Sequence, residues 1–297
     1  MYNIRKKLWF IMLLLFIISP VMLRLSPRDK PGTVTASTYS DTAQAFESGV
    51  WQDDGRERFV AHRGYSNYAP ENSIPAFELA GKHGFWGIET DISETTDGQF
   101  VCMHDEELNR TTNGTGLVTD YSLDQLDGFK IDRGNNVEVT ENLKIPTLSE
   151  YLEICLKYRC VAVVEIKSVK NYDEFLNVIR NSGMTSGCII TGNINDMLEI
   201  RARNSEIPVM TIGYAPAPYT DNLVDIAQIP DNRGVLYNYP QVDKAAIDTL
   251  HQQNIYCGVW SVDDKNIAEE YLSYGADYVV TNEIPARLQY DMLNENE

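Results

Sequence analysis

The sequence predicts an α/β fold, a closed (β/α)8 barrel, and three observations support this prediction. Short runs of β-branched and aromatic residues alternate with amphipathic segments, a pattern typical of parallel strands joined by crossover helices. Eight strand-like runs follow Arg58, and a closed barrel accommodates eight strands better than an open sheet does. The length of 297 residues also suits one barrel of roughly 250 residues with a segment before it.

The barrel elements can be located one by one along the chain. Strands are expected at 58–62, 87–92, 161–167, 187–191, 208–213, 234–238, 256–262 and 277–282. Helices are expected at 73–84, 147–158, 171–183, 194–204, 243–254 and 265–275. Several of these amphipathic segments end in Gly or Asn, as helix C-termini do.

A ninth strand-like run, at 99–104, does not add to the barrel count. It follows the second barrel strand through a short turn that contains Asp97-Gly98, a strong hairpin signal. We expect it to be the return arm of a small hairpin over the barrel mouth. In such barrels the functional residues gather at the C-terminal ends of the strands.

The N-terminal part of the chain predicts a membrane anchor. Three basic residues at 5–7 precede a charge-free apolar run from Leu8 to Leu23, near the short end of a membrane span. We expect a short cytoplasmic tail at 1–7, a transmembrane signal anchor at 8–24, a flexible linker at 25–55 and the barrel domain at 56–297. The expected location is the cell membrane, single-pass, with the domain outside the cytoplasm. A cleaved signal peptide is the alternative.

Composition excludes some classes of function. The formal net charge of −18 argues against a general nucleic-acid binder, which needs a basic face. The five cysteines are odd in number and lack metal-ligand spacing, so we expect buried free thiols. Neither a nucleotide-binding glycine loop nor a nucleophile elbow is present, and no feature implies a protein partner.

Carboxylates on two predicted strands indicate a metal site. Glu89 and Asp91 are two residues apart, so on a strand they point to one face. Glu165 and Lys167 have the same spacing on the next barrel strand. If these side chains face the barrel interior, three buried carboxylates need a cation, and oxygen ligands suit Mg²⁺ or Ca²⁺. The alternative is a set of solvent-facing acidic residues.

Two histidines end strand-like runs near this expected site. His62 ends the first strand and His104 ends the hairpin arm, so the pair could act as general acid and general base. Arg63 offers a planar set of donors that matches phosphate oxygens, and Lys167 adds a second positive charge. These residue types together indicate metal-assisted phosphoryl chemistry.

The stretch from Ala61 to Gly116 resembles the glycerophosphodiester phosphodiesterase family. The matching pieces are His-Arg-Gly at 62–64, Pro-Glu-Asn-Ser at 70–73, Glu-Thr-Asp at 89–91, Thr-Asp-Gly at 96–98, His-Asp at 104–105 and Leu-Asn-Arg-Thr-Thr at 108–112. Glu-Ile-Lys at 165–167, Gly-Val-Trp-Ser-Val at 258–262 and the segment 275–285 also look like that family. The similarity spans about 58–288, and as an ordered set the motifs are specific.

The resemblance implies a TIM barrel that uses one divalent cation, Ca²⁺ or Mg²⁺, to hydrolyse glycerophosphodiesters to glycerol 3-phosphate and an alcohol. It implies roles for nine positions: His62 and His104 as catalytic acid and base, Glu89, Asp91 and Glu165 as metal ligands, and Arg63, Lys167, Glu71 and Trp260 in binding phosphate or substrate. For Trp260 a core position is the alternative.

The chain departs from the family's pattern at a few positions. Ser73 stands for the usual Thr, and Ser261 and Asp263 stand for a more usual Thr and Asn. We expect Asp263 to add negative charge near the pocket. The variable segment from Leu117 to Leu148 looks short and polar, which would leave the mouth fairly open.

Two other functions remain open at this point. The membrane anchor would suit a lysophospholipase D-type activity on lysophospholipids, with residues 214–223 as the candidate apolar wall. A non-catalytic barrel that binds the cell envelope is the other alternative, although such a protein would not need the histidine pair. Which histidine is the acid, and which cation is bound, cannot be read from the sequence.

Overall fold

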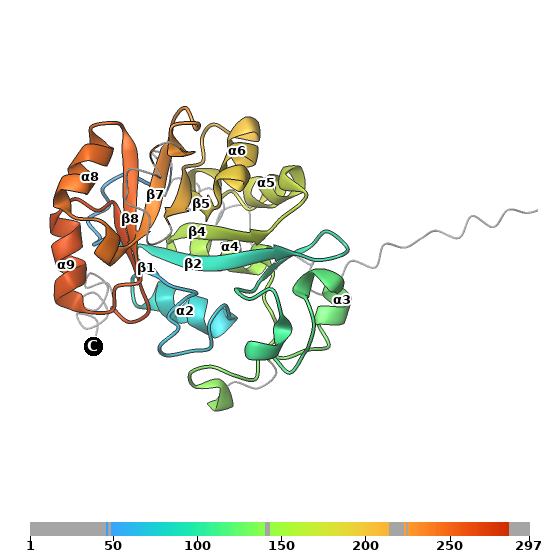
Figure 1. Ribbon diagram of the computed structural model, residues 1–297. Helices are drawn as coiled ribbons and strands as arrows, with labels where there is room; N and C mark the ends of the chain where they lie inside the picture. The colour runs from blue at the N-terminus through green and yellow to red at the C-terminus, as the bar shows by residue number, and fades with distance from the viewer. Residues whose placement is uncertain (1–45, 47–48, 140–142, 214–222, 224, 285–297) are drawn as a thin grey trace, which may run out of the picture. The chain divides into compact units, whose positions relative to one another are not determined.

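The computed structural model describes residues 46, 49–139, 143–213, 223 and 225–284, and its centre is a nine-stranded sheet (Figure 1). Every strand pairing is parallel except that between β2 and β3. The strands are β1 (Phe59–Ala61), β2 (Gly87–Glu94), β3 (Phe100–Cys102), β4 (Val161–Ser168), β5 (Cys188–Gly192), β6 (Val209–Gly213), β7 (Arg233–Asn238), β8 (Ile255–Trp260) and β9 (Tyr278–Thr281).

The parallel strands close into a barrel because β1 pairs on both of its edges. Ala61 lies opposite Ile88 of β2 on one side and opposite Thr281 of β9 on the other. All eight predicted barrel strands are confirmed, each at its expected place. Their apolar residues, among them Val60, Ile88 and Val163, are fully buried.

Helices alternate with the barrel strands and begin at polar residues that cap them. The α-helices are α2 (Ile74–Lys82), α3 (Leu123–Leu126), α4 (Leu148–Tyr158), α5 (Tyr172–Asn181), α6 (Ile194–Arg203), α8 (Lys244–His251) and α9 (Lys265–Ser273). Single 3-10 turns lie at Leu108–Arg110, Val118–Asp120, Val137–Val139, Thr185–Gly187 and Tyr239–Gln241. Before α4, Thr147 and Glu150 form a reciprocal capping box that satisfies two helix N–H groups. The six predicted helices are therefore confirmed.

The predicted hairpin is also confirmed. β3 pairs antiparallel with the last residues of β2, with Ile92 opposite Cys102 and Glu94 opposite Phe100. The backbone N–H of Met103 then donates to the carbonyl of Asp91 at 2.9 Å. This bond returns the chain to the C-terminal end of the barrel, so that His104 follows at the mouth.

The segment after the hairpin is not merely polar, and that expectation was wrong. Between Leu117 and Leu148, Leu123, Leu126, Ile131 and Ile145 are buried. They pack with Val101, Met103, Leu108, Val118 and Leu143 in a cluster separate from the main core. The segment therefore forms a second small core beside the barrel strands.

An aromatic stack covers the N-terminal ends of the strands, opposite the mouth. The ring of Trp51 lies 4.2 Å from that of Tyr256 and 6.2 Å from that of Trp86, with Arg58 over its face. Phe46 and Val50 are buried in the same core. These three residues at 46–51 lie within the range expected to be a linker, so packed structure begins before residue 56.

All five cysteines are free and buried, as the sequence predicted. Burial raises the pKa of each thiol, for example that of Cys160 to about 11. The expected anchor at 8–24 lies outside the described residues. Among the described helices, none is both long and apolar enough to cross a membrane.

Candidate active site

Three carboxylates from two neighbouring strands meet at the barrel mouth. Glu89 and Asp91 come from β2 and Glu165 from β4, where Asp91 lies directly opposite Glu165 in the parallel register. One oxygen of each carboxylate lies within 4.8 Å of the others. Glu89 is 3% and Asp91 1% exposed. The structure thus brings the predicted ligand set together.

The protein does not fully neutralise or hydrogen-bond the three carboxylates of this cluster. Burial, followed by the charges of Asp91 and Glu165, raises the pKa of Glu89 well above its usual range. Its Oε2 accepts the backbone N–H of Arg63 at 2.7 Å, whereas Oε1 is buried without a hydrogen-bond partner among the described residues. A buried, unpaired carboxylate oxygen beside two other carboxylates fits a divalent cation.

The two predicted phosphate-binding cations lie on these carboxylates. Lys167 Nζ contacts Glu165 and lies 3.2 Å from Asp91 Oδ1, while Arg63 Nε is 3.6 Å from Asp91 Oδ2. Burial alone would lower the pKa of Lys167, but the charges of Asp91 and Glu165 outweigh it and raise that pKa. Both cations therefore stay charged next to the expected metal position.

A tight turn after β1 places Arg63. Its φ of 57° and that of 77° at Gly64 are both in the left-handed region, which sets the Arg63 N–H toward Glu89. A Cβ on Gly64 would lie 2.7 Å from the Cβ of Ala76 in α2. The His-Arg-Gly sequence thus needs its glycine, since α2 packs directly against the turn.

His62 lies at the end of β1, with its ring fixed by a loop after β9. Its Nδ1 is 2.9 Å from the side-chain oxygen of Asn282, and its backbone N–H donates to the carbonyl of Thr281 at 2.8 Å. Burial, and secondly the charge of Arg63, lowers the pKa of His62. The neutral ring that results is the form that can accept a proton.

The ring of His104 is held by the next residue in sequence, Asp105. Its Nδ1 lies 2.7 Å from Asp105 Oδ1, and Arg110 in turn binds Asp105 through Nε and Nη2. Both predicted catalytic histidines therefore have Nδ1 engaged by an acceptor. Nε2 of each ring is left without a hydrogen-bond partner among the residues that the structure describes.

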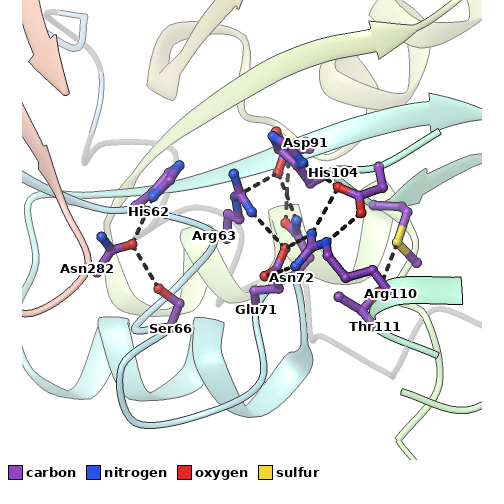
Figure 2. Close-up of polar contacts among 12 residues, drawn as sticks. His62, Arg63, Ser66, Glu71, Asn72, Asp91, His104, Arg110, Thr111 and Asn282 are labelled. Atoms are coloured by element: carbon purple, nitrogen blue, oxygen red, sulfur yellow. Dashed lines mark hydrogen bonds and ion pairs between the residues drawn. The ribbon is translucent and has the colours of Figure 1, made fainter. Parts of the chain in front are cut away.

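Arg110 was not among the predicted site residues, yet it links one of them, Glu71, to Asp105, which contacts His104 (Figure 2). Its Nη1 and Nη2 each contact Glu71 at 2.7 Å, and Glu71 also accepts from Arg63 Nη1 at 2.8 Å. Although burial alone would raise it, the pKa of Glu71 falls to about 2 because of Arg110 and Arg63. Hydrogen bonds from Arg110 likewise hold the pKa of Asp105 at about 2.

Asn72 is a second residue that the sequence reasoning did not single out. It is 3% exposed, has a φ of 51°, and donates from Nδ2 to Asp91 Oδ2 at 2.8 Å. Its side-chain oxygen accepts from Thr90. Asn72 therefore orients one carboxylate of the cluster. The signal was its place after Glu71 in the Pro-Glu-Asn turn.

The remaining predicted residues have different environments. Trp260 ends β8 and is half-buried, with Nε1 buried and unbonded to any described residue. The carboxylate of Asp263 accepts hydrogen bonds from the side chain and the backbone N–H of Asn282, which orient it without neutralising its negative charge. Of the candidate apolar wall at 214–223, only residue 223 lies among the described residues.

Comparisons with known proteins agree with this geometry. The model of the glycerophosphoryl diester phosphodiesterase family matches residues 62–286. A glycerophosphodiester phosphodiesterase of Caldanaerobacter subterraneus is 29% identical over 233 residues, covering 75% of this chain and 93% of that protein. Human glycerophosphodiester phosphodiesterase 1 is 36% identical over 139 residues, covering 43% of this chain and 41% of that one.

Solved structures show the same fold. A phosphodiesterase of Oleispira antarctica, in complex with the product sn-glycerol-3-phosphate, aligns with a TM-score of 0.66 at 22% identity, covering 82% of this chain and 98% of that one. A glycerophosphodiester phosphodiesterase of Agrobacterium tumefaciens aligns with a TM-score of 0.65 at 24% identity, covering 76% and 96%. Since the family model covers most of the chain, the protein belongs to the glycerophosphoryl diester phosphodiesterase family of phosphoric diester hydrolases.

Proposed function

We propose that this protein hydrolyses glycerophosphodiesters to glycerol 3-phosphate and an alcohol, with a divalent cation and the His62–His104 pair. The observation that carries the proposal is the convergence of both histidines with Glu89, Asp91 and Glu165 at one end of the barrel, where His62 lies within electrostatic range of Asp91 and His104, and His104 within that of Glu165. The sn-glycerol-3-phosphate found with the Oleispira relative supports this choice of product.

The charge balance of the site supports a cation. Five carboxylates, those of Glu71, Glu89, Asp91, Asp105 and Glu165, face only three cations, those of Arg63, Arg110 and Lys167. One divalent ion would neutralise the excess of −2 and let a phosphodiester anion approach. Glu89, Asp91 and Glu165 would hold this ion, which when bound polarises a phosphoryl oxygen and stabilises the charge that develops on it.

The chain's own residues would bind the phosphate and move protons. Arg63 and Lys167 lie beside the carboxylate cluster, where each can turn a donor to a phosphoryl oxygen. One histidine takes a proton through its Nε2 from the attacking water as the new P–O bond forms. The other gives a proton to the alkoxide as the old P–O bond breaks.

The decisive assay follows release of glycerol 3-phosphate from glycerophosphocholine by the full chain in detergent. We expect turnover that EDTA abolishes and Ca²⁺ or Mg²⁺ restores, and its loss in His62→Ala. His83→Gln is the matched control, because His83 packs on Tyr65 outside the site. Turnover that persists in His62→Ala would contradict the mechanism. No turnover of this diester, with release of choline from lysophosphatidylcholine, would favour the lysophospholipase alternative.

The proposal includes a location. The charge-free run from Leu8 to Leu23 after three basic residues supports a single membrane anchor at 8–24 with the barrel domain outside the cytoplasm. In intact cells, added protease should then degrade the domain, and the full-length chain should remain in the membrane fraction after a carbonate wash. Recovery of a shortened chain from the medium would instead indicate a cleaved signal peptide.

A further inference from the structure

The side chain of Asn282 lies between His62 and Asp263. Its Oδ1 is 2.9 Å from His62 Nδ1, and its Nδ2 is 2.9 Å from Asp263 Oδ2 and 3.2 Å from Asp263 Oδ1. Ser66 Oγ also contacts Oδ1, at 3.2 Å (Figure 2). Three segments far apart in sequence, namely the turn after β1, the end of β8 and the end of β9, thus meet at one amide group.

The chemistry of Asp263 fixes which way this amide points. An ionised carboxylate only accepts hydrogen bonds, so the NH₂ end of Asn282 must face it. The carboxylate itself is held in place by the backbone N–H of Asn282 at 2.8 Å and by the Thr281 hydroxyl at 3.2 Å. The carbonyl end of the amide therefore faces His62.

We infer that Asn282, oriented by Asp263, holds neutral His62 in the tautomer with the proton on Nδ1, so that the lone pair lies on Nε2. A carbonyl oxygen cannot donate, so His62 Nδ1 must carry the hydrogen of that 2.9 Å contact. The Ser261 hydroxyl, 3.4 Å from the same Nδ1, can accept as well. Only the use of Nε2 in proton transfer rests on the proposed function.

Asp263 matters in this arrangement because a side-chain amide has two different ends, a carbonyl that accepts and an NH₂ group that donates. If the Asn282 side chain rotated by half a turn, an NH₂ group would point at His62 Nδ1. That nitrogen would then have to accept, and the proton would move to Nε2, the atom needed for chemistry. A carboxylate in contact with His104, that of Asp105, carries no such ambiguity. Asp263 and Asn282 are thus positioning residues, and the charge of Asp263 acts on the amide rather than on the substrate.

The tautomer can be measured directly in the full chain with ring-¹⁵N histidine. The chain has only 4 histidines, and His62→Ala identifies the His62 signals by their loss. At about pH 8, where the lowered pKa of His62 leaves the ring neutral, we expect a protonated Nδ1 and an unprotonated Nε2. Asn282→Ala and Asp263→Asn should each give a mixture of both tautomers.

Steady-state kinetics provide a second measurement. A double variant in which the residues at 263 and 282 are exchanged serves as the rescue. Asn282→Ala and Asp263→Asn should each lower kcat by roughly tenfold to a hundredfold, the range for outer hydrogen-bond partners, with little change in KM. The double variant Asp263→Asn/Asn282→Asp keeps one amide and one carboxylate and again places an acceptor at Nδ1. It should restore the Nδ1-protonated ring and most of kcat. Glu283→Gln is the neighbouring control and should change neither.

Measuring the tautomer and the turnover separately distinguishes the inference about Asn282 from the proposed function. A wild-type His62 ring protonated on Nε2, or an Asn282→Ala ring unchanged from wild type, overturns the inference even if the enzyme is active. A ring that depends on Asn282 in a chain without turnover of any glycerophosphodiester supports the inference and contradicts the proposed function. If Asn282→Ala does not fold, Asp263→Asn and the wild-type spectrum still decide the question.

Discussion

At the scale of single residues, Arg110 is the least expected member of the site. Its guanidinium contacts both Glu71, which binds Arg63, and Asp105, which binds His104. A planar fork can bridge two carboxylates in a way that a lysine cannot. Arg110 therefore links the phosphate-binding side of the site to one of its histidines.

We expect Arg110→Lys to lower kcat for glycerophosphocholine by roughly tenfold to a hundredfold, because Glu71 and Asp105 lose their shared partner. Steady-state kinetics would measure this, with Arg133→Lys as the control. Arg133 lies on a nearby loop, where it donates to the carbonyl of Asn109. Equal kcat in wild type and Arg110→Lys would show that the bridge has no role in catalysis.

At the scale of elements, the sequence indicated every barrel strand because each is an apolar run bounded by turn residues. The carboxylate set was predictable for the same reason, since residues two apart on a strand share a face. The contacts of Asn72, Arg110 and Asn282 were not predictable, because they depend on turns that bring distant loops together. The small core between Leu117 and Leu148 escaped notice because its apolar residues follow no regular period.

The aromatic stack at the N-terminal ends of the strands should act on stability alone. Trp51→Ala removes the ring that packs on Tyr256 and Trp86. Because Trp51 is only half-buried, we expect a loss of about 2 kcal/mol in the free energy of unfolding, less than the roughly 3–5 kcal/mol for a buried tryptophan. Urea unfolding measures the loss, and kcat per folded molecule should be unchanged. A fall in kcat without a loss of stability would contradict this assignment.

The contact between the end of α8 and the residue before β9 should make the free energy of unfolding depend on pH. His251 Nε2 lies 3.0 Å from Asp277 Oδ2, and this hydrogen bond raises the pKa of His251 above 6.5. The stabilisation is fully present below the unfolded pKa and is lost as pH rises through the folded one. His251→Gln should therefore lower the free energy of unfolding more at about pH 5.5 than at about pH 8.5. An equal loss at both values would contradict the pairing.

At the scale of the whole molecule, metal binding should stabilise the fold. The three carboxylates come from β2 and β4, so an ion bound only by the folded chain shifts the unfolding equilibrium. At an ion concentration of about 100 times Kd the gain is about 2.7 kcal/mol. Thermal unfolding in EDTA and then in Ca²⁺ or Mg²⁺ would show it as a rise in Tm. Glu89→Gln should lose this rise, whereas Glu153→Gln, with an exposed side chain on α4, should keep it.

The five buried thiols can report local unfolding of the barrel. Cys102, Cys155, Cys188 and Cys257 lie on β3, α4, β5 and β8, and Cys160 lies just before β4. None can be alkylated until the residues that cover it move away, since the reactive form is the thiolate, and burial both shields the sulfur and raises the pKa of the thiol. A pulse of iodoacetamide followed by peptide mass analysis would therefore read the order in which neighbouring parts of the barrel come apart. No engineered cysteine would be needed, because the chain's own thiols already lie on β3, α4, β5 and β8 and just before β4.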